Sequence, residues 1–222
     1  MKKLLLATAA AALCAGAVQA EDIKVGVFLG FTGPLEALTP QMGQSAEMAF
    51  AEINAAGGVL DGKMLVPVRA DSTCGDAAAG TAAAERLVTA DGIVAMVGGD
   101  CSGVTGAVLQ SVARPNGILM ISPSATSPAL TTAETDGLFF RTSPSDARQG
   151  VVMTDILNAR GIKSVAVTYT NNDYGKGLAE AFKAAYEAAG GTVTIMAAHE
   201  DGKADYSAEV GALASAGGEA VS

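Results

Sequence analysis

The sequence predicts an α/β protein built on two doubly wound parallel sheets, the second of them incomplete. Short apolar and β-branched runs alternate strictly with Ala-rich segments of helical periodicity, which is the order of parallel sheets with helices on both faces. The apolar runs lack a polar face, as strands buried on both sides do. The alternation forms two series that meet near Thr142, so we expect two lobes.

Residues 1–20 have the pattern of a cleaved export signal. Two lysines precede a long apolar stretch, and the small residues Val18 and Ala20 stand at the −3 and −1 positions of a cleavage site. Cys14 offers lipid attachment as an alternative, but the residue before it, Leu13, is bulky where that modification needs a small one. We therefore expect export and cleavage before Glu21.

The first series predicts five strands and three helices. The apolar positions from Met42 to Ile53 recur at helical spacing, and the glycine pair at 57–58 ends that helix. Asp76 is placed to cap the next helix, and Gly92 to end it. The expected order is strand 23–29, the helix from Met42, strand 64–70, helix 77–90, strand 93–97, helix 102–113, strand 118–121 and strand 138–141.

The second series predicts a smaller unit. Its expected order is helix 147–159, strand 164–169, helix 174–189, strand 192–197, helix 207–216, and then a turn with the first residues of another strand. Two strands make a very small sheet, so we expect a truncated chain with a lobe over 21–141 and a partial lobe over 142–222. A naturally short C-terminus is the alternative.

Composition and charge exclude several classes of function. The chain has 14 basic and 23 acidic residues, and cleavage of the signal removes two lysines and no acid. Such a surface argues against binding of nucleic acid or anionic lipid. No later apolar run is long enough to span a membrane. The single histidine, His199, argues against a His-rich metal site, and we expect neither a metal nor a cofactor.

Two cysteines, Cys74 and Cys101, remain after signal cleavage. An even pair in an exported chain predicts a disulfide, which would close a loop of about 28 residues and contribute about 3.5 kcal/mol in the chain-entropy model. Two buried free thiols are the alternative. Cys101 also lies in a G-x-C-x-G turn between a strand and a helix, where hydrolases place a nucleophile, but His199 lies in the other series.

Binding is the stronger hypothesis, because four loops follow strands at the edge where open α/β sheets bind ligands. Ser102 opens a helix, whose N–H groups favour an anion such as a carboxylate. Ser124, Ala125 and Thr126 lie between two prolines that restrict their loop. Tyr174 could lay its ring on a ligand from the other lobe. Ordinary Ser/Thr turns and a surface tyrosine are the alternatives.

At these residues the chain resembles the leucine/isoleucine/valine-binding proteins of the periplasm. These are the solute receptors of branched-chain amino-acid ABC transporters, and they have the type I periplasmic binding fold. The resemblance covers nearly all of residues 21–222. It rests on EDIKVGVFLGFTGP at the start, AEINAAGGVLDGK, the Cys74 segment, DCS at 100–102, GILMISPSATSPALT at 117–131, FFRTSPSDARQG at 139–150 and NDYGKG at 172–177.

The resemblance implies a role for each candidate residue. Ser102 matches a serine that holds the ligand carboxylate, Ser124 matches a position of main-chain contacts, and Thr126 matches a threonine that binds both charged ends of the ligand. Tyr174 matches a tyrosine that closes over the ligand, and Cys74 with Cys101 matches the disulfide of the first lobe. Leu38 stands where these proteins often place a tyrosine, so it bears on side-chain specificity.

We therefore expect a monomeric, non-enzymatic receptor in the periplasm. It would capture a branched-chain or other small aliphatic amino acid in a cleft between the lobes and deliver it to a membrane permease, with no nucleic-acid partner and no membrane insertion after signal cleavage. The family's acidic partner for the ligand ammonium lies beyond the matching segment. An exported hydrolase with Cys101 as nucleophile, and a sensory ligand-binding module, remain the alternatives.

Overall fold

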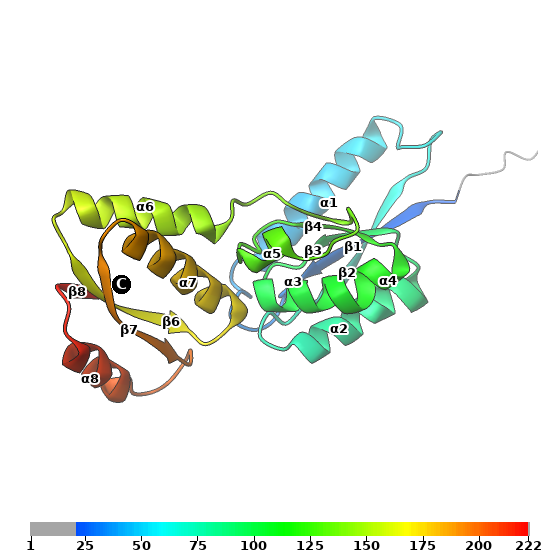
Figure 1. Ribbon diagram of the computed structural model, residues 1–222. Coiled ribbons are helices and arrows are strands. Elements are labelled where there is room, and N and C mark those ends of the chain that lie inside the picture. The colour runs from blue at the N-terminus through cyan, green and yellow to red at the C-terminus, as the bar shows by residue number, and fades with distance from the viewer. Residues whose placement is uncertain (1–20, 222) are drawn as a thin grey trace, which may run out of the picture.

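The computed structural model describes residues 21–221, so the predicted signal peptide lies outside the described residues. Figure 1 shows two separate sheets, each with its own helices. The strands of the first sheet are in the order β2-β1-β3-β4-β5 and those of the second in the order β7-β6-β8. All their pairings are parallel. The predicted α/β class and the two doubly wound sheets are confirmed.

We call the first sheet with its helices the first lobe. Its elements along the chain are β1 (Ile23–Leu29), α1 (Thr39–Ala55), β2 (Leu65–Asp71), α2 (Ala77–Arg86), η1 (Leu87–Asp91), β3 (Ala95–Gly98), α3 (Ser102–Val108), η2 (Leu109–Ala113), α4 (Arg114–Asn116), β4 (Leu119–Ser122), α5 (Ala129–Thr132) and β5 (Phe139–Arg141).

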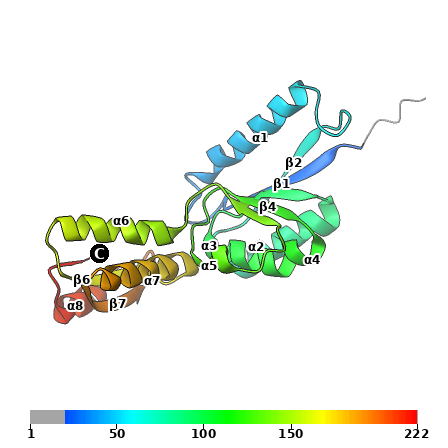
Figure 2. The ribbon, with the colours of Figure 1, turned by 45° about the horizontal axis from the view of Figure 1, so that its top comes forward.

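Helices cover both faces of the first sheet. Figure 2 shows α1 on one side and α2 with α4 on the other. On the α2 side, Phe28 and Met120 of the strands pack with Leu87 and Val104 in one buried cluster. On the α1 side, the inward residues of β1 pack against Phe50. The sheet is thereby held as a rigid base whose carboxyl edge carries the candidate loops.

Several predicted boundaries of the first lobe are wrong by a few residues. The first helix begins at Thr39 rather than Met42, and the helix expected over 77–90 changes to π geometry at Leu87. The third strand begins at Ala95 rather than Ile93. The Ile93 N–H donates a hydrogen bond to the Leu87 carbonyl at 3.1 Å, so Ile93 belongs to the end of the preceding helix and not to the sheet. The four-residue helix α5 was not predicted, because it is too short to show a period.

The second lobe is the second sheet with its helices. It consists of α6 (Asp146–Ala159), β6 (Ser164–Thr170), α7 (Asp173–Ala188), β7 (Thr192–His199), α8 (Ser207–Ala216) and β8 (Ala220–Val221). In Figure 1 the sheet lies between α7 and α8, and α6 packs beside α7. The fully buried Tyr186 of α7 stacks on Phe182 and donates a hydrogen bond to the Ile162 carbonyl at 3.0 Å.

The second sheet has one strand more than the two complete strands that the sequence predicts. The residues expected to begin another strand do pair, since Ala220 and Val221 lie beside Val165 and Ala166 of β6. None of the helices within residues 21–221 combines the length and the apolar character that crossing a bilayer requires.

Candidate functional site

The carboxyl ends of β1, β2 and β3 are joined by one buried carboxylate, that of Asp100. Its two oxygens accept hydrogen bonds from the Gly30 N–H at 2.9 Å and from the Ser72 hydroxyl at 2.7 Å. Its backbone carbonyl accepts a third bond, from the Ser124 hydroxyl at 3.0 Å. Asp100 is 2% exposed. These bonds compensate the burial of the carboxyl group and fix the loops that follow β1, β2, β3 and β4 relative to one another.

Ser102 is the first residue of α3 and is buried at this edge. Its hydroxyl oxygen accepts a hydrogen bond from the Ser127 N–H at 3.2 Å. Among residues 21–221, no acceptor lies in hydrogen-bonding reach of the Ser102 hydroxyl proton. The side chain is thus oriented by the neighbouring loop and keeps one donor for a further partner.

The loop that carries Ser124 and Ala125 is shaped by Ser122. The Ser122 hydroxyl donates to the Gly99 carbonyl at 2.5 Å and accepts from the Ala125 N–H at 2.9 Å. Ala125 is fully buried, and its carbonyl accepts a bond from the Arg141 guanidinium at 3.2 Å. The Ala125 N–H and carbonyl are therefore already paired, and the Ser124 hydroxyl proton is already donated to Asp100.

Thr126 connects the two lobes. Its hydroxyl donates to the Asp146 carboxylate at 2.8 Å, and the Asp146 N–H donates to the Thr126 carbonyl at 3.0 Å. Asp146 is the first residue of α6 and is 4% exposed. Because the Thr126 hydroxyl donates its proton to Asp146, the pair can only accept further hydrogen bonds. Its acceptors are the hydroxyl oxygen of Thr126 and the carboxylate oxygens of Asp146.

Tyr174 lies in the first turn of α7 and is half-exposed. Burial raises the pKa of its hydroxyl above the usual value, and the negative charge of Asp146 raises that pKa further. Tyr174 also lines a hollow of about 240 Å³ between α6, α7 and the end of β6. Apolar side chains such as Met153, Leu178 and Phe182 form most of its wall.

The candidate residues fall into two groups. Ser102 lines a second hollow, of about 410 Å³, between α3, α5 and α7, whereas Tyr174 lines the hollow of the second lobe. Asp146 connects Thr126 of the first lobe with Tyr174 of the second, since it bonds Thr126 and raises the pKa of Tyr174. Leu38 precedes α1, is 60% exposed, and lines neither of these two hollows.

The predicted disulfide is present. Cys74 and Cys101 are bonded, with their Cα atoms 5.2 Å apart. The bond connects the loop before α2 to the residue that caps α3. A disulfide sulfur has no thiolate to act as nucleophile, so the G-x-C-x-G turn gives no support to the hydrolase alternative. The alternative of two free thiols is wrong.

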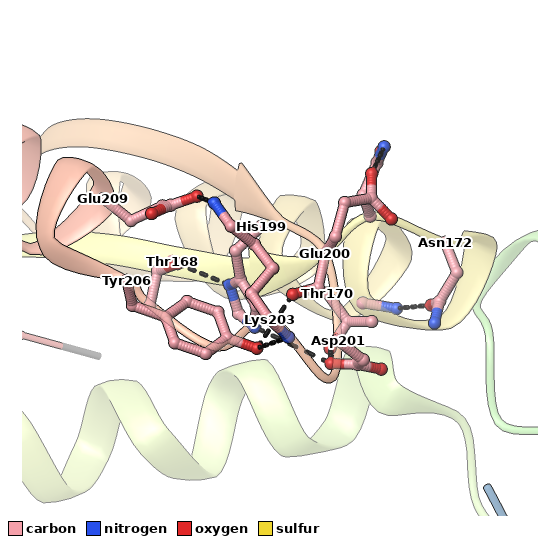
Figure 3. A network of polar contacts seen from close by, with 11 residues as sticks. Thr168, Thr170, Asn172, His199, Glu200, Asp201, Lys203, Tyr206 and Glu209 are labelled. Atoms are coloured by element: carbon pink, nitrogen blue, oxygen red, sulfur yellow. Dashed lines mark hydrogen bonds and ion pairs between the residues drawn. The ribbon is translucent and has the colours of Figure 1, made fainter.

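His199 belongs to a polar network at the end of β7 (Figure 3). Its Nδ1 atom lies 2.7 Å from the Thr168 hydroxyl. The loop after it closes on itself, because Tyr206 donates to the Glu200 carbonyl at 2.9 Å and Lys203 pairs with Glu209. The network braces this loop against α8. No group of three His, Cys, Asp or Glu side chains with the geometry of a metal site occurs within 21–221.

Sequence reasoning missed Asp146 and the buried role of Asp100. Acidic residues are common at the start of helices, because their negative charge interacts favourably with the positive end of the helix dipole. Asp146 therefore carries no distinctive signal in the sequence. Its contact with Thr126 joins residues of two lobes, which periodicity does not reveal. Asp100 lies within the DCS phrase that was recognised, but its hydrogen bonds to Gly30 and Ser72 depend on strand order.

Comparison with known proteins gives consistent results. A family model described as periplasmic binding protein matches residues 22–222. Leu/Ile/Val-binding protein homolog 3 of Brucella melitensis is 40% identical over 201 residues, which are 90% of this chain and 53% of that protein. The chain spans about half the length of the curated relatives it matches.

Solved structures share the fold. The branched-chain amino acid transporter substrate binding protein LivJ from Streptococcus pneumoniae, in complex with isoleucine, matches with a TM-score of 0.75 and 30% identity, over 90% of this chain and 56% of that one. A substrate-binding protein of an ABC transporter from Desulfitobacterium hafniense, in complex with leucine, matches with a TM-score of 0.67 and 29% identity, over 88% and 54%.

Proposed function

Because this chain belongs to the periplasmic binding protein family, we propose that it captures a small aliphatic amino acid between its two lobes and delivers it to the permease of an ABC transporter. The similarity to proteins solved with isoleucine and with leucine supports an amino-acid ligand. We place the division between the lobes at residues 141–142. The proposal includes export to the periplasm after signal cleavage, action as a monomer, and no enzymatic activity.

The observation that carries this proposal is the opposite hydrogen-bonding character of two neighbouring groups. A free amino acid presents a carboxylate and an ammonium group, and burying either unpaired costs several kcal/mol. Ser102 offers a hydroxyl proton suited to the carboxylate. Thr126 and Asp146 offer oxygen acceptors, one of them charged, that suit the ammonium group. The resemblance alone assigned Thr126 to both ends of the ligand, whereas its bond to Asp146 favours the ammonium end.

The apolar end of the ligand is assigned to the second lobe and to Leu38. The hollow behind Tyr174 has an apolar wall, and such a wall favours an aliphatic side chain over a charged one. Leu38 is exposed on the loop after β1, where it is free to contact a ligand side chain. Closure would bring Tyr174 over the ligand, and we propose that a permease recognises the two lobes in that arrangement.

A thermal unfolding panel with the twenty common amino acids tests the proposal. A ligand present at 100 times its dissociation constant stabilises a protein by about 2.7 kcal/mol, which raises the Tm of a chain of this size by about 5–10 °C. We expect this increase for leucine, isoleucine or valine and none for glutamate or lysine. No increase with any amino acid, or equal increases with lysine and leucine, would refute the proposed ligand class.

A further inference from the structure

The two lobes also meet where α7 faces the segment between β4 and α5. Gly177 of α7 lies against Ser127 and Pro128, and a Cβ atom added to Gly177 would be 2.9 Å from the Ser127 hydroxyl oxygen and 3.1 Å from Cδ of Pro128. Both distances are shorter than ordinary carbon contacts, which begin near 3.5 Å. No side chain larger than hydrogen fits at position 177 unless α7 or its neighbours move.

The Ser127–Pro128 segment has little freedom to yield. The Ser127 N–H donates to Ser102, and the Ser127 carbonyl accepts a bond from Arg141 at 2.9 Å. Ser127 is 3% exposed, and Pro128 is the N-cap residue of α5, with a φ angle that its ring restricts. The Ser127 hydroxyl can rotate away from an added methyl group, but the ring of Pro128 cannot. A larger residue at 177 would therefore displace α7.

Displacement of α7 would move the proposed ligand contact. Tyr174 precedes Gly177 by three residues on the same helix, so a displacement of the helix moves both residues. The first turn of α7 faces α3 as well, since a Cβ atom added to Gly103 would be 3.5 Å from a carboxylate oxygen of Asp173. A shift of α7 away from Ser127 therefore carries Tyr174 away from the part of the first lobe that contains Ser102 and Ser127.

We infer that Gly177 is a positioning residue: the absence of a side chain there sets the closest approach of the two lobes and thereby the affinity for the ligand. The affinity part of this inference rests on the proposed function. The part of the inference that concerns the distance between the lobes does not rest on the proposed function, because this distance can be measured in the chain without ligand.

The test compares two substitutions at Gly177 with two matched controls. Gly177→Ala and Gly177→Val add one and three carbons at the contact. Gly106→Ala lies on the wall of the same 410 Å³ hollow, where an added Cβ comes no closer than 3.9 Å to another residue. Gly211→Ala lies within α8, where an added Cβ meets none of the described residues within 4 Å. All three alanine variants gain helix propensity.

The expected results distinguish an effect on the stability of the chain from an effect on the distance between the lobes. Alanine at 211 or 106 should raise the Tm by about 2–4 °C and leave the distance between the lobes unchanged, and alanine at 211 should also leave the ligand affinity unchanged. Spin labels on unnatural residues at exposed Glu85 and Ser215 should report a longer distance between the lobes in Gly177→Val without ligand. The apparent affinity of Gly177→Ala should fall about tenfold, in proportion to the loss of the closed arrangement, although its Tm does not fall.

Two results would overturn the inference. An unchanged label distance in folded Gly177→Val would show that position 177 does not limit the approach of the lobes. Unchanged affinity in both Gly177 variants would show that the approach does not govern binding. If the parent chain binds no amino acid, the distance measurement still decides the inference on its own.

Discussion

Asp146 is the residue that most changes the picture obtained from the sequence alone. The carboxyl-end rule was sufficient to select Ser102, Ser124, Thr126 and Tyr174, because each follows a strand. Asp146 also follows a predicted strand, that at 138–141, but its loop was not among the four selected; its carboxylate accepts the hydroxyl proton of Thr126 and its charge raises the pKa of Tyr174. Leu38 remains a prediction based on resemblance, and its contribution to side-chain preference depends on the exposed loop in which it lies.

The charge of Asp146 can be tested through Tyr174. The Tyr174 pKa is raised in the folded chain, so its contribution to stability is fully present below the unfolded pKa of about 10 and is lost as the pH rises through the folded pKa. Asp146→Asn removes one cause, so tyrosinate absorbance assigned with Tyr174→Phe should appear at lower pH. Affinity for an aliphatic amino acid should fall about 10- to 100-fold with the lost charged hydrogen bond.

Asp155→Asn is the matched control for this substitution. Asp155 is an exposed carboxylate on the same helix, so its replacement changes the net charge equally. It should leave both the Tyr174 titration and the affinity unchanged. Equal effects of the two substitutions would mean that net charge, rather than the position of Asp146, determines the result.

At the scale of elements, the sequence predicted which segments form helices and strands better than where they begin and end. The helix 207–216 was predicted with its observed bounds, since Gly217 ends it. The helix 77–90 was not, because the helix changes to π geometry at the buried Leu87, and helical periodicity does not distinguish the two geometries. The helix α5 is confined between Pro128 and Ala133, and four residues carry no periodicity.

At the scale of elements, the disulfide is the feature whose contribution to the free energy of unfolding can be predicted most directly. It ties the loop before α2 to the start of α3 and so supports the edge that carries Ser102. Its loop predicts a contribution of about 3.5 kcal/mol, hence a decrease in Tm of about 10 °C on reduction. Thiol titration of the oxidised mature chain should detect no free thiol. One reactive thiol per chain, or an unchanged Tm after reduction, would contradict this account.

At the scale of the whole molecule, the sequence predicted two lobes but not how they face each other. Periodicity and caps are local signals, whereas the approach of the lobes depends on pairs distant in sequence, such as Thr126 with Asp146 and Ser127 with Gly177. The glycine at 177 appeared within a recognised phrase, but nothing in the phrase indicates what it faces. Folding of both lobes is required before this contact exists.

Isothermal titration of L-isoleucine tests the central claim most directly. The parent chain is compared with Ser102→Ala and with Ser111→Ala, a control whose exposed hydroxyl bonds only the Ala107 carbonyl among the described residues. We predict saturable one-to-one binding by the parent and the control, and binding about 10- to 100-fold weaker by Ser102→Ala, since that variant lacks the hydroxyl that we propose as a donor to the ligand carboxylate. No saturable heat with isoleucine, leucine or valine, or undiminished affinity in Ser102→Ala, would contradict it.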